Sequence, residues 1–452
     1  MLWYTTHNMK RHLIKDLRDC VDSEVMISGK IASVRDHGKI LFLDVYDRSG
    51  RVQCFMHSSH SSFTATQKIS PESVISLTGH AKKRPEKNIT EDENGDIEFI
   101  IDSITVLSHA HELPFDIQTE VNIDTKFDYR PITLRRSEDR AVFLVQSHIV
   151  RAFREYLTSE EFTEFQAPCI VGGDAEGGAE VFSVDYFDKR VSLATSPQLY
   201  KQMLVGVFER VFCVGQAFRA EKHNTSRHLN EYTSIDFEMG YITDHTDVMK
   251  TLEGCVRHIV TTLTHTAERE FTLLNATIPA MPDKPFPVVK FAEAQRILGE
   301  KYGIACEGEP DFAPEHERKL CEYAKDEFGS DFLFVTHYPV EKRPMYVYED
   351  EDDPGFTKSF DLLFRGVEIC SGGQRIHEYE KLVRKIQQKL PASDSVERFG
   401  FYLQAFKYGM PPHGGMAIGL ERLTAKMLGI ANTKEAAIFP RDRGRIDTRL
   451  YE

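Results

Sequence analysis

Two stretches of the sequence combine arginine with residues that would let a polyanion approach closely. Residues 218–232 contain Arg219 and Arg227 beside carboxylates and a tyrosine, and residues 414–422 place three glycines before Arg422. An arginine keeps its charge at working pH and carries five hydrogen-bond donors, while glycine leaves room at the backbone. One such arginine alone would be an ordinary surface ion pair. Two stretches of this kind predict a phosphate-binding site.

Predicted strands position both stretches. Strands at 211–214 and 234–239 flank the first one, so its charged and aromatic side chains lie on one side of a sheet. The second stretch starts as a strand at 416–418 and enters a helix at Gly419. Arg422 therefore lies near a helix N-terminus, where the helix dipole also favours phosphate.

A long helix is predicted upstream of these strands. Ser137 is a suitable N-cap, acidic residues follow in the first turn, and an apolar stripe continues to Leu157. The helix leads toward Pro168, and a second helix is expected over 247–264. The pattern alone fits an ordinary core helix.

The N-terminal part of the chain alternates apolar and polar residues. Between residues 24 and 108 the alternation predicts five strands, and the Ser/Thr-rich segment around 57–70 could hold a helix between the third and fourth. This arrangement suits a small OB barrel, although another five-stranded barrel stays open. Residues 109–135 are polar and poorly periodic, and are expected to form a hinge or linker.

The composition limits the class of protein. The chain has 452 residues, no apolar run long enough to span a membrane and no secretory signal, so we expect a cytoplasmic protein without a membrane partner. The eight cysteines show no pairing typical of zinc sites or disulfides. A formal charge of −14 means that any nucleic-acid contact depends on local basic clusters.

Together the motifs resemble the class II aminoacyl-tRNA synthetases, and the residues of the substrate site narrow the resemblance to aspartyl-tRNA synthetases of the archaeal and eukaryotic type, subclass IIb. The resemblance implies an α+β protein with an N-terminal five-stranded OB barrel and an antiparallel sheet flanked by helices. The implied domains are an anticodon-binding barrel at 1–108, a linker at 109–135 and a catalytic domain at 136–452, with motif 1 about 137–168, motif 2 about 211–239 and motif 3 about 414–428.

The resemblance implies that ATP is a substrate and that Arg219 and Arg422 are catalytic. Glu221 would accept from the adenine amino group and Tyr232 would stack on the ring. The residues implied for ATP are Arg219, Glu221, His223, Arg227, Tyr232, Glu368 and Arg422. Glu368 and Ser371 would hold Mg²⁺, for which oxygen ligands are suited; Asp361 is a weaker candidate for the same metal.

Binding of L-aspartate requires cations for its side-chain carboxylate, because unmatched buried charge is costly. The resemblance assigns this role to Lys201 and Arg375, with Asp236 orienting Lys201. The full implied set is Glu176, Ser196, Gln198, Lys201, Asp236, Ser371 and Arg375. On this argument asparagine would leave both cations unmatched, and lysine would be repelled.

RNA binding is expected at the barrel. Phe42 and Gln53 match positions where relatives stack on and recognise an anticodon base, although Phe42 is equally well explained as a core residue. The acceptor is tRNA(Asp), with tRNA(Asn) left open, and motif 1 implies a homodimer. The alternatives are an asparaginyl-tRNA synthetase, a catalytically silent RNA-binding paralogue and an aspartate-activating relative that makes asparagine.

Overall fold

The computed structural model describes the chain except for residues 1–8, 91–93, 174–179, 223–224, 391–394 and 447–452. The chain divides into two compact units, Met1–Thr119 and Glu120–Glu452. None of the helices in the described ranges is long and apolar enough to cross a membrane.

The first unit is a barrel closed by pairing of β2 with β5. Side chains alternate along its strands, so that Leu41, Leu43 and Val45 enter the core while their neighbours face outward. The short helix α1 (Phe63–Thr66) lies between the third and fourth long strands, as predicted. The strand order is β1-β2-β3-β4-β6-β5, with bounds β1 (Arg11–His12), β2 (Glu24–Asp36), β3 (Ile40–Tyr46), β4 (Arg51–His57), β5 (Val74–Lys83) and β6 (Ile97–Ser108). The prediction of five strands in an OB barrel is confirmed, and the two-residue β1 was not foreseen.

The segment 109–135 is more structured than a linker. Its second half forms α2 (Ile123–Asp128) and α3 (Arg130–Thr133), which belong to the second unit. The guanidinium of Arg130 is buried and donates to the backbone carbonyls of Glu435, Ala437 and Ile438. Two helices of six and four residues are too short to show the periodicity that identifies a helix in a sequence.

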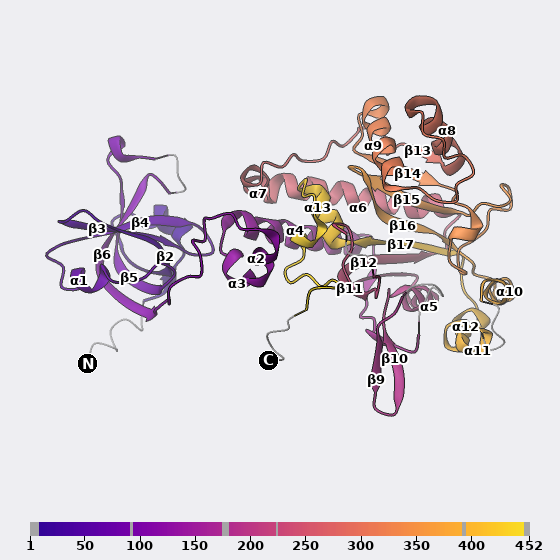
Figure 1. The fold of residues 1–452 in the computed structure, drawn as a ribbon, viewed down its shortest axis with the longest axis horizontal. Helices are drawn as coiled ribbons and strands as arrows, with labels where there is room; N and C mark the ends of the chain where they lie inside the picture. The colour runs from indigo at the N-terminus through magenta and orange to yellow at the C-terminus, as the bar shows by residue number, and fades with distance from the viewer. Residues whose placement is uncertain (1–8, 91–93, 174–179, 223–224, 391–394, 447–452) are drawn as a thin grey trace. The chain divides into compact units, whose positions relative to one another are not determined.

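The second unit is built on an eight-stranded sheet, shown in Figure 1. Neighbouring strands are antiparallel from β14 to β11, and the two outermost pairs are parallel. The order is β13 (Val288–Lys290), β14 (Phe332–Thr336), β15 (Ser359–Phe364), β16 (Val367–Arg375), β17 (His413–Gly419), β12 (Glu231–Gly240), β11 (Arg210–Phe218) and β7 (Thr163–Glu164). A separate small sheet has the order β8 (Ile170–Val171), β10 (Lys189–Leu193) and β9 (Ser183–Tyr186).

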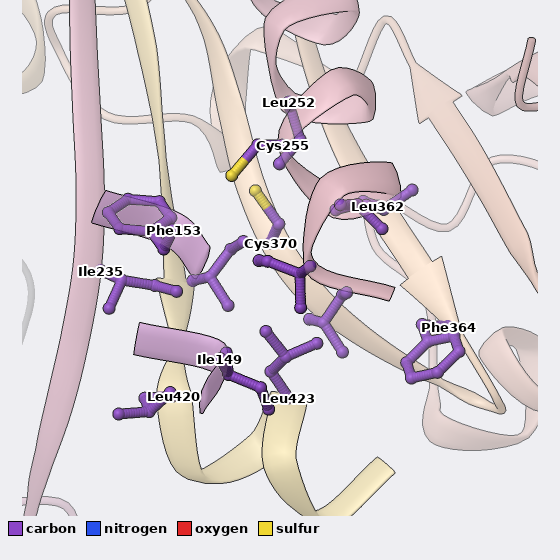
Figure 2. Close-up of a cluster of buried hydrophobic side chains, with 14 of the residues drawn as sticks. Ile149, Phe153, Ile235, Leu252, Cys255, Leu362, Phe364, Cys370, Leu420 and Leu423 are labelled. Carbon is purple, nitrogen blue, oxygen red and sulfur yellow. The ribbon is translucent and has the colours of Figure 1, made fainter. Parts of the chain in front are cut away.

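Helices α4 (Ser137–Ser159) and α6 (His245–Thr266) pack their apolar sides against one face of the large sheet. Figure 2 shows this core, in which Phe153 of α4 and Cys255 of α6 lie near side chains of the sheet and of α13 (Leu420–Met427). The N-cap of α4 is Arg136, and Ser137 is already helical. The expected capping role of Ser137 is therefore wrong by one residue.

The remaining helices surround the sheet. Helices α8 and α9 form a satellite core with β14 and β15 through Leu298, Leu320, Leu333 and Leu363. The bounds are α5 (Gln198–Phe208), α7 (Glu268–Leu273), α8 (Phe291–Tyr302), α9 (Pro314–Phe328), α10 (Tyr379–Lys389), α11 (Ser395–Arg398) and α12 (Gly400–Lys407), and 3-10 helices cover Ile14–Cys20, Glu86–Asn88, Val340–Lys342 and Thr433–Ala436. All eight cysteines are free, and six are buried, as expected for small apolar side chains.

Candidate active site

Apolar and polar residues alternate along strand β12, so they lie on opposite faces of the sheet. Ile235 and Phe237 enter the apolar core under the helices, whereas Ser234, Asp236 and Glu238 alternate with them and belong to the opposite face. The sequence from 232 to 239 therefore supplies both the core and a line of polar groups. The face of the sheet away from α4 and α6 is the one that carries the candidate site.

A cavity of about 400 Å³ lies over this polar face. Ten of the predicted site residues line it: Ser196, Gln198, Arg219, Glu221, Arg227, Tyr232, Glu368, Ser371, Arg375 and Arg422. Lys201 and Asp236 are not among the lining residues and are completely buried. The predicted residues Glu176 and His223 lie outside the described residues.

At one end of the cavity, the chain leaves β11 at Arg219 and re-enters the sheet near Tyr232. The side-chain amide of Asn230 donates to the carbonyls of Arg219, at 2.6 Å, and Glu221, at 3.1 Å, and so fixes this turn. The guanidinium carbon of Arg219 lies 5.8 Å from the centre of the Tyr232 ring. Asn230 was not predicted, yet it determines where both charged residues stand.

Two further arginines stand at the same end of the cavity. Arg422, in the first turn of α13, donates from Nη1 to the carbonyl of Glu368 at 2.8 Å. Arg227 Nη1 lies 3.2 Å from Oε2 of Glu317 on α9. Burial and the nearby Glu368 carboxylate raise the pKa of Glu317 to about 7, against the opposing effect of Arg227. Sequence reasoning missed Glu317, because the region 265–355 contains no recognisable motif.

At the other end lies a cluster of buried charges. The Lys201 ammonium donates to Asp236 Oδ2 and to the carbonyl of Met416, both at 2.8 Å, and is 3.5 Å from Glu238 Oε2. Arg375 donates from Nε to Glu238 Oε1 at 2.8 Å. None of the four ionisable side chains is more than 5% exposed. Asp236, the expected neighbour of Lys201, contacts it, and Glu238, which was not predicted, lies beside both cations.

Gly415 makes room for this cluster. A Cβ atom at this position would lie 2.1 Å from Glu238 Oε2 and 2.3 Å from the carbonyl oxygen of Phe237, which no side chain can occupy. The carbonyl of Gly415 accepts from Arg375 Nη2 at 2.9 Å. The glycine of the third motif is therefore needed here for the carboxylate of Glu238, in addition to any close approach of a ligand.

Oxygen donors lie between the two ends of the cavity. The Ser371 hydroxyl donates to Glu368 Oε1 at 2.9 Å. Arg343 Nη2 donates to Oδ1 of Asp361 at 2.8 Å. Burial raises the pKa of Asp361 to about 6, although the nearby guanidinium acts to lower it. Arg343 itself lines the cavity and was not predicted from the sequence. In the part of the chain that the structure describes, no group of three or more His, Cys, Asp and Glu residues could hold a metal.

The candidate RNA-binding residues lie on the outer face of the barrel. Phe42 on β3 and Gln53 on β4 are both half-buried, and these two strands are paired. Their sequence neighbours on each strand point into the core, so Phe42 and Gln53 point outward. The Phe42 ring contacts those of His37 and Phe55, with centroids 5.4 Å and 6.1 Å away. The interpretation of Phe42 as a core residue is therefore wrong.

Family models match both units of the chain. The model of the tRNA synthetases class II (D, K and N) matches residues 122–443, and that of the OB-fold nucleic acid binding domain matches residues 25–107. The chain belongs to the class II tRNA synthetases. The matched class II region contains every predicted residue of the cavity, and the OB-fold region contains Phe42 and Gln53.

Individual relatives of this class II synthetase extend over nearly the whole chain. "Aspartate--tRNA(Asp/Asn) ligase" of Thermus thermophilus is 47% identical, over 96% of this chain and 99% of the relative. "Aspartate--tRNA(Asp) ligase" of Picrophilus torridus is 41% identical, over 96% and 99%. The crystal structure of asparaginyl-tRNA synthetase from Pyrococcus horikoshii complexed with asparaginyl-adenylate is similar with a TM-score of 0.88 and 28% identity, over 97% of this chain and 99% of that chain.

Proposed function

We propose that this class II synthetase is an aspartate--tRNA ligase, which activates L-aspartate with ATP and transfers it to the 3′ end of tRNA(Asp). The observation that carries the proposal is a single cavity with arginines at one end and the buried Arg375 and Glu238 pair at the other. The names of relatives at 41–47% identity support aspartate as the amino acid. The likeness to an asparaginyl enzyme is weaker, at 28% identity.

Recognition of the aspartate side chain depends on the fixed guanidinium of Arg375. Glu238 holds Nε and the carbonyl of Gly415 holds Nη2, so the group cannot turn away from the cavity that it lines. With Nε and Nη2 engaged in this way, Nη1 is proposed to donate to the aspartate carboxylate, whose two oxygens both accept, whereas the amide nitrogen of asparagine cannot accept. Lys201 shares Glu238 with Arg375 and adds positive charge from below the surface of the cavity. Ser196 and Gln198 line the same cavity and are proposed to contact the rest of the amino acid, together with Glu176.

The activation step requires no protein base. The α-carboxylate of aspartate attacks the α-phosphorus of ATP, a carboxyl–phosphate bond forms, and pyrophosphate leaves with the bonding pair. Negative charge grows on the phosphoryl oxygens, and Arg219, which lines the cavity, is proposed to neutralise it. The terminal ribose hydroxyl of tRNA then attacks the carbonyl of aspartyl-adenylate and releases AMP, a step helped by positioning.

The donor set between the two ends fits Mg²⁺. Glu368 and Ser371 present two oxygens that are 2.9 Å apart, and both residues line the cavity. Magnesium is commonly held by one or two protein oxygens, with phosphates and water completing its shell. These two residues would hold the ion, which would offset phosphate charge when bound.

The activation half of the proposal is tested by ATP–pyrophosphate exchange without tRNA. We expect exchange that depends on aspartate, with asparagine at least a hundredfold less effective, in line with rejection by unpaired buried polar groups. Glu368→Gln is expected to raise the Mg²⁺ concentration needed for half-maximal exchange. Exchange driven by asparagine and not by aspartate would assign the chain to the asparaginyl enzymes instead.

We also propose that the enzyme is a cytoplasmic homodimer whose barrel contacts the anticodon. The outward face of α4 supports the dimer, since Leu144 is exposed and Phe143 and Val150 line an open hollow on that face. A measured mass of one chain at micromolar concentration would contradict it. The Thermus thermophilus relative is named for both tRNA(Asp) and tRNA(Asn), which supports testing tRNA(Asn) as a second acceptor.

A further inference from the structure

Glu317 lies outside all the motifs and yet reaches the phosphate end of the cavity. It belongs to α9, 90 residues after Arg227 in the sequence, and its Oε2 is 3.2 Å from Arg227 Nη1. The Glu317 side chain is 14% exposed and that of Arg227 is 28% exposed. A charge pair that is largely withdrawn from water is stronger than one at the surface.

Glu317 offsets a local excess of positive charge. Arg422 and Lys426 project from α13, and Arg227 comes from the loop after β11. Burial lowers the pKa of Lys426, and Arg227 and Arg422 lower it further, whereas Glu317 acts in the opposite direction. These three cations repel one another, so without a counter-charge the Arg227 guanidinium, whose side chain is 28% exposed, would turn toward solvent.

The position of Glu317 is fixed from two sides. Helix α9 packs Leu320 and Ala324 against Leu333 of the sheet, which holds the helix in place. The backbone N–H of Glu368 also favours the ionised form of Glu317 and lowers its pKa. Helix packing and the contact with Arg227 therefore hold the carboxylate at this end of the cavity.

Glu317 does not line the cavity, whereas Arg227, Glu368 and Arg422 do. Any effect that it has on a ligand must therefore pass through these neighbours. We propose that Glu317 is a positioning residue, which holds the Arg227 guanidinium beside Arg422 so that both face the outer phosphates of a nucleoside triphosphate. The inference rests on the proposed function, because it assigns the outer phosphates of ATP to this end of the cavity.

The test compares Glu317→Ala with Glu317→Gln in aspartate-dependent ATP–pyrophosphate exchange. For Glu317→Ala we expect the KM for ATP to rise about tenfold, with kcat and the KM for aspartate within about twofold, since an anchored charged hydrogen bond is lost. Glutamine keeps an acceptor oxygen for Arg227, so its KM should lie between those of the wild type and the alanine variant. Glu315→Ala, an exposed site on the same helix, is the matched control and should leave all three constants unchanged.

A double variant decides whether Glu317 acts through Arg227. In an Arg227→Ala background, Glu317→Ala should add nothing to the KM for ATP, because residues that act as one unit are not additive. Additive effects, or a fall in kcat with an unchanged KM for ATP, would overturn the inference. Calorimetric binding of ATP alone gives a second measurement of the same effect. If wild-type protein binds ATP but shows no aspartate-dependent exchange, the proposed function fails while the role of Glu317 is still decided by binding.

Discussion

The two ends of the cavity hold similar kinds of side chain in opposite conditions. At the end proposed to bind the amino acid, Lys201 and Asp236 are completely buried and form an ion pair. At the nucleotide end, the side chains of Arg219 and Glu221 are 38% and 34% exposed and lie 3.9 Å apart. One end is therefore withdrawn from solvent with its charges paired, and the other is partly exposed to solvent.

The difference is consistent with the ligand that each end is proposed to bind. Buried ionic groups must be paired, which makes the amino acid end rigid and selective for shape and charge. Exposed guanidinium groups keep their water until a polyanion displaces it, so they tolerate the movement of phosphates as pyrophosphate leaves. We therefore expect selectivity for the amino acid to arise at the buried end, where the charged groups are already desolvated and paired.

The contrast between the two ends of the cavity depends most on Glu238. Glu238→Ala leaves Arg375 and Lys201 buried with one carboxylate fewer, and we expect a loss of about 3–5 kcal/mol in the unfolding free energy of the catalytic unit. Activity should be lost with it. Glu221→Ala at the nucleotide end is the control, with an expected change within about 1 kcal/mol. Denaturant unfolding measures both, and equal losses would mean that the two ends do not differ as described.

The nucleotide end should lose chemistry without losing stability. Arg219→Ala is expected to lower ATP–pyrophosphate exchange by about 10²–10³-fold or more, because a preorganised charge on the phosphoryl oxygens is removed. The unfolding midpoint should stay close to that of the wild type, because the side chain is partly hydrated. A near-normal exchange rate would remove Arg219 from the active site.

Acid should lower the stability of the catalytic unit through the buried His413. Burial lowers the pKa of His413 from 6.5 to about 4, so the folded protein keeps this imidazole neutral between those values while the unfolded chain binds a proton. Its contribution to the free energy of unfolding therefore falls as the pH decreases from about 6.5 to 4, by about 2 kcal/mol between pH 7 and pH 5. His413→Gln should reduce the loss of stability over this interval by that amount. The same dependence of unfolding free energy on pH in the wild type and the variant would contradict the prediction.

The smallest effect is expected outside the cavity altogether. Gln53→Ala should weaken charging of tRNA(Asp) by about tenfold, with aspartate-dependent pyrophosphate exchange unchanged, since the residue lies in the barrel. Phe42→Ala is a companion variant that removes a stacking surface. Loss of both activities in Gln53→Ala would exclude a role confined to the anticodon.

The sequence alone identified those site residues that stand within short continuous motifs. Arg219, Tyr232 and Arg422 stand within short motifs on predictable strands and a helix, and all three line the cavity. Glu238 follows Asp236 by two residues on the same strand, so the alternation of β12 could have identified it. Sequence analysis assigned only Asp236 to Lys201, and the structure adds Glu238 as a second carboxylate, 3.5 Å from the ammonium.

Other parts were beyond sequence reasoning for physical reasons. Glu317 meets Arg227 only because α9 packs on β14, β15 and β16, and no local pattern reports a contact between residues so far apart in the sequence. The barrel was predictable because its alternation is long and regular. The helices within 109–135 were not, because short helices held by Arg130 depend on tertiary contacts.

The most direct test of the central claim is attachment of amino acids to tRNA(Asp) transcript by the purified protein with ATP and Mg²⁺. Aspartate and asparagine are supplied in parallel, and tRNA(Asn) transcript is tested beside tRNA(Asp). We predict that aspartate is attached to tRNA(Asp) and that asparagine is attached to neither transcript. Attachment of asparagine to tRNA(Asn) without attachment of aspartate would contradict the assignment of the buried end of the cavity to aspartate.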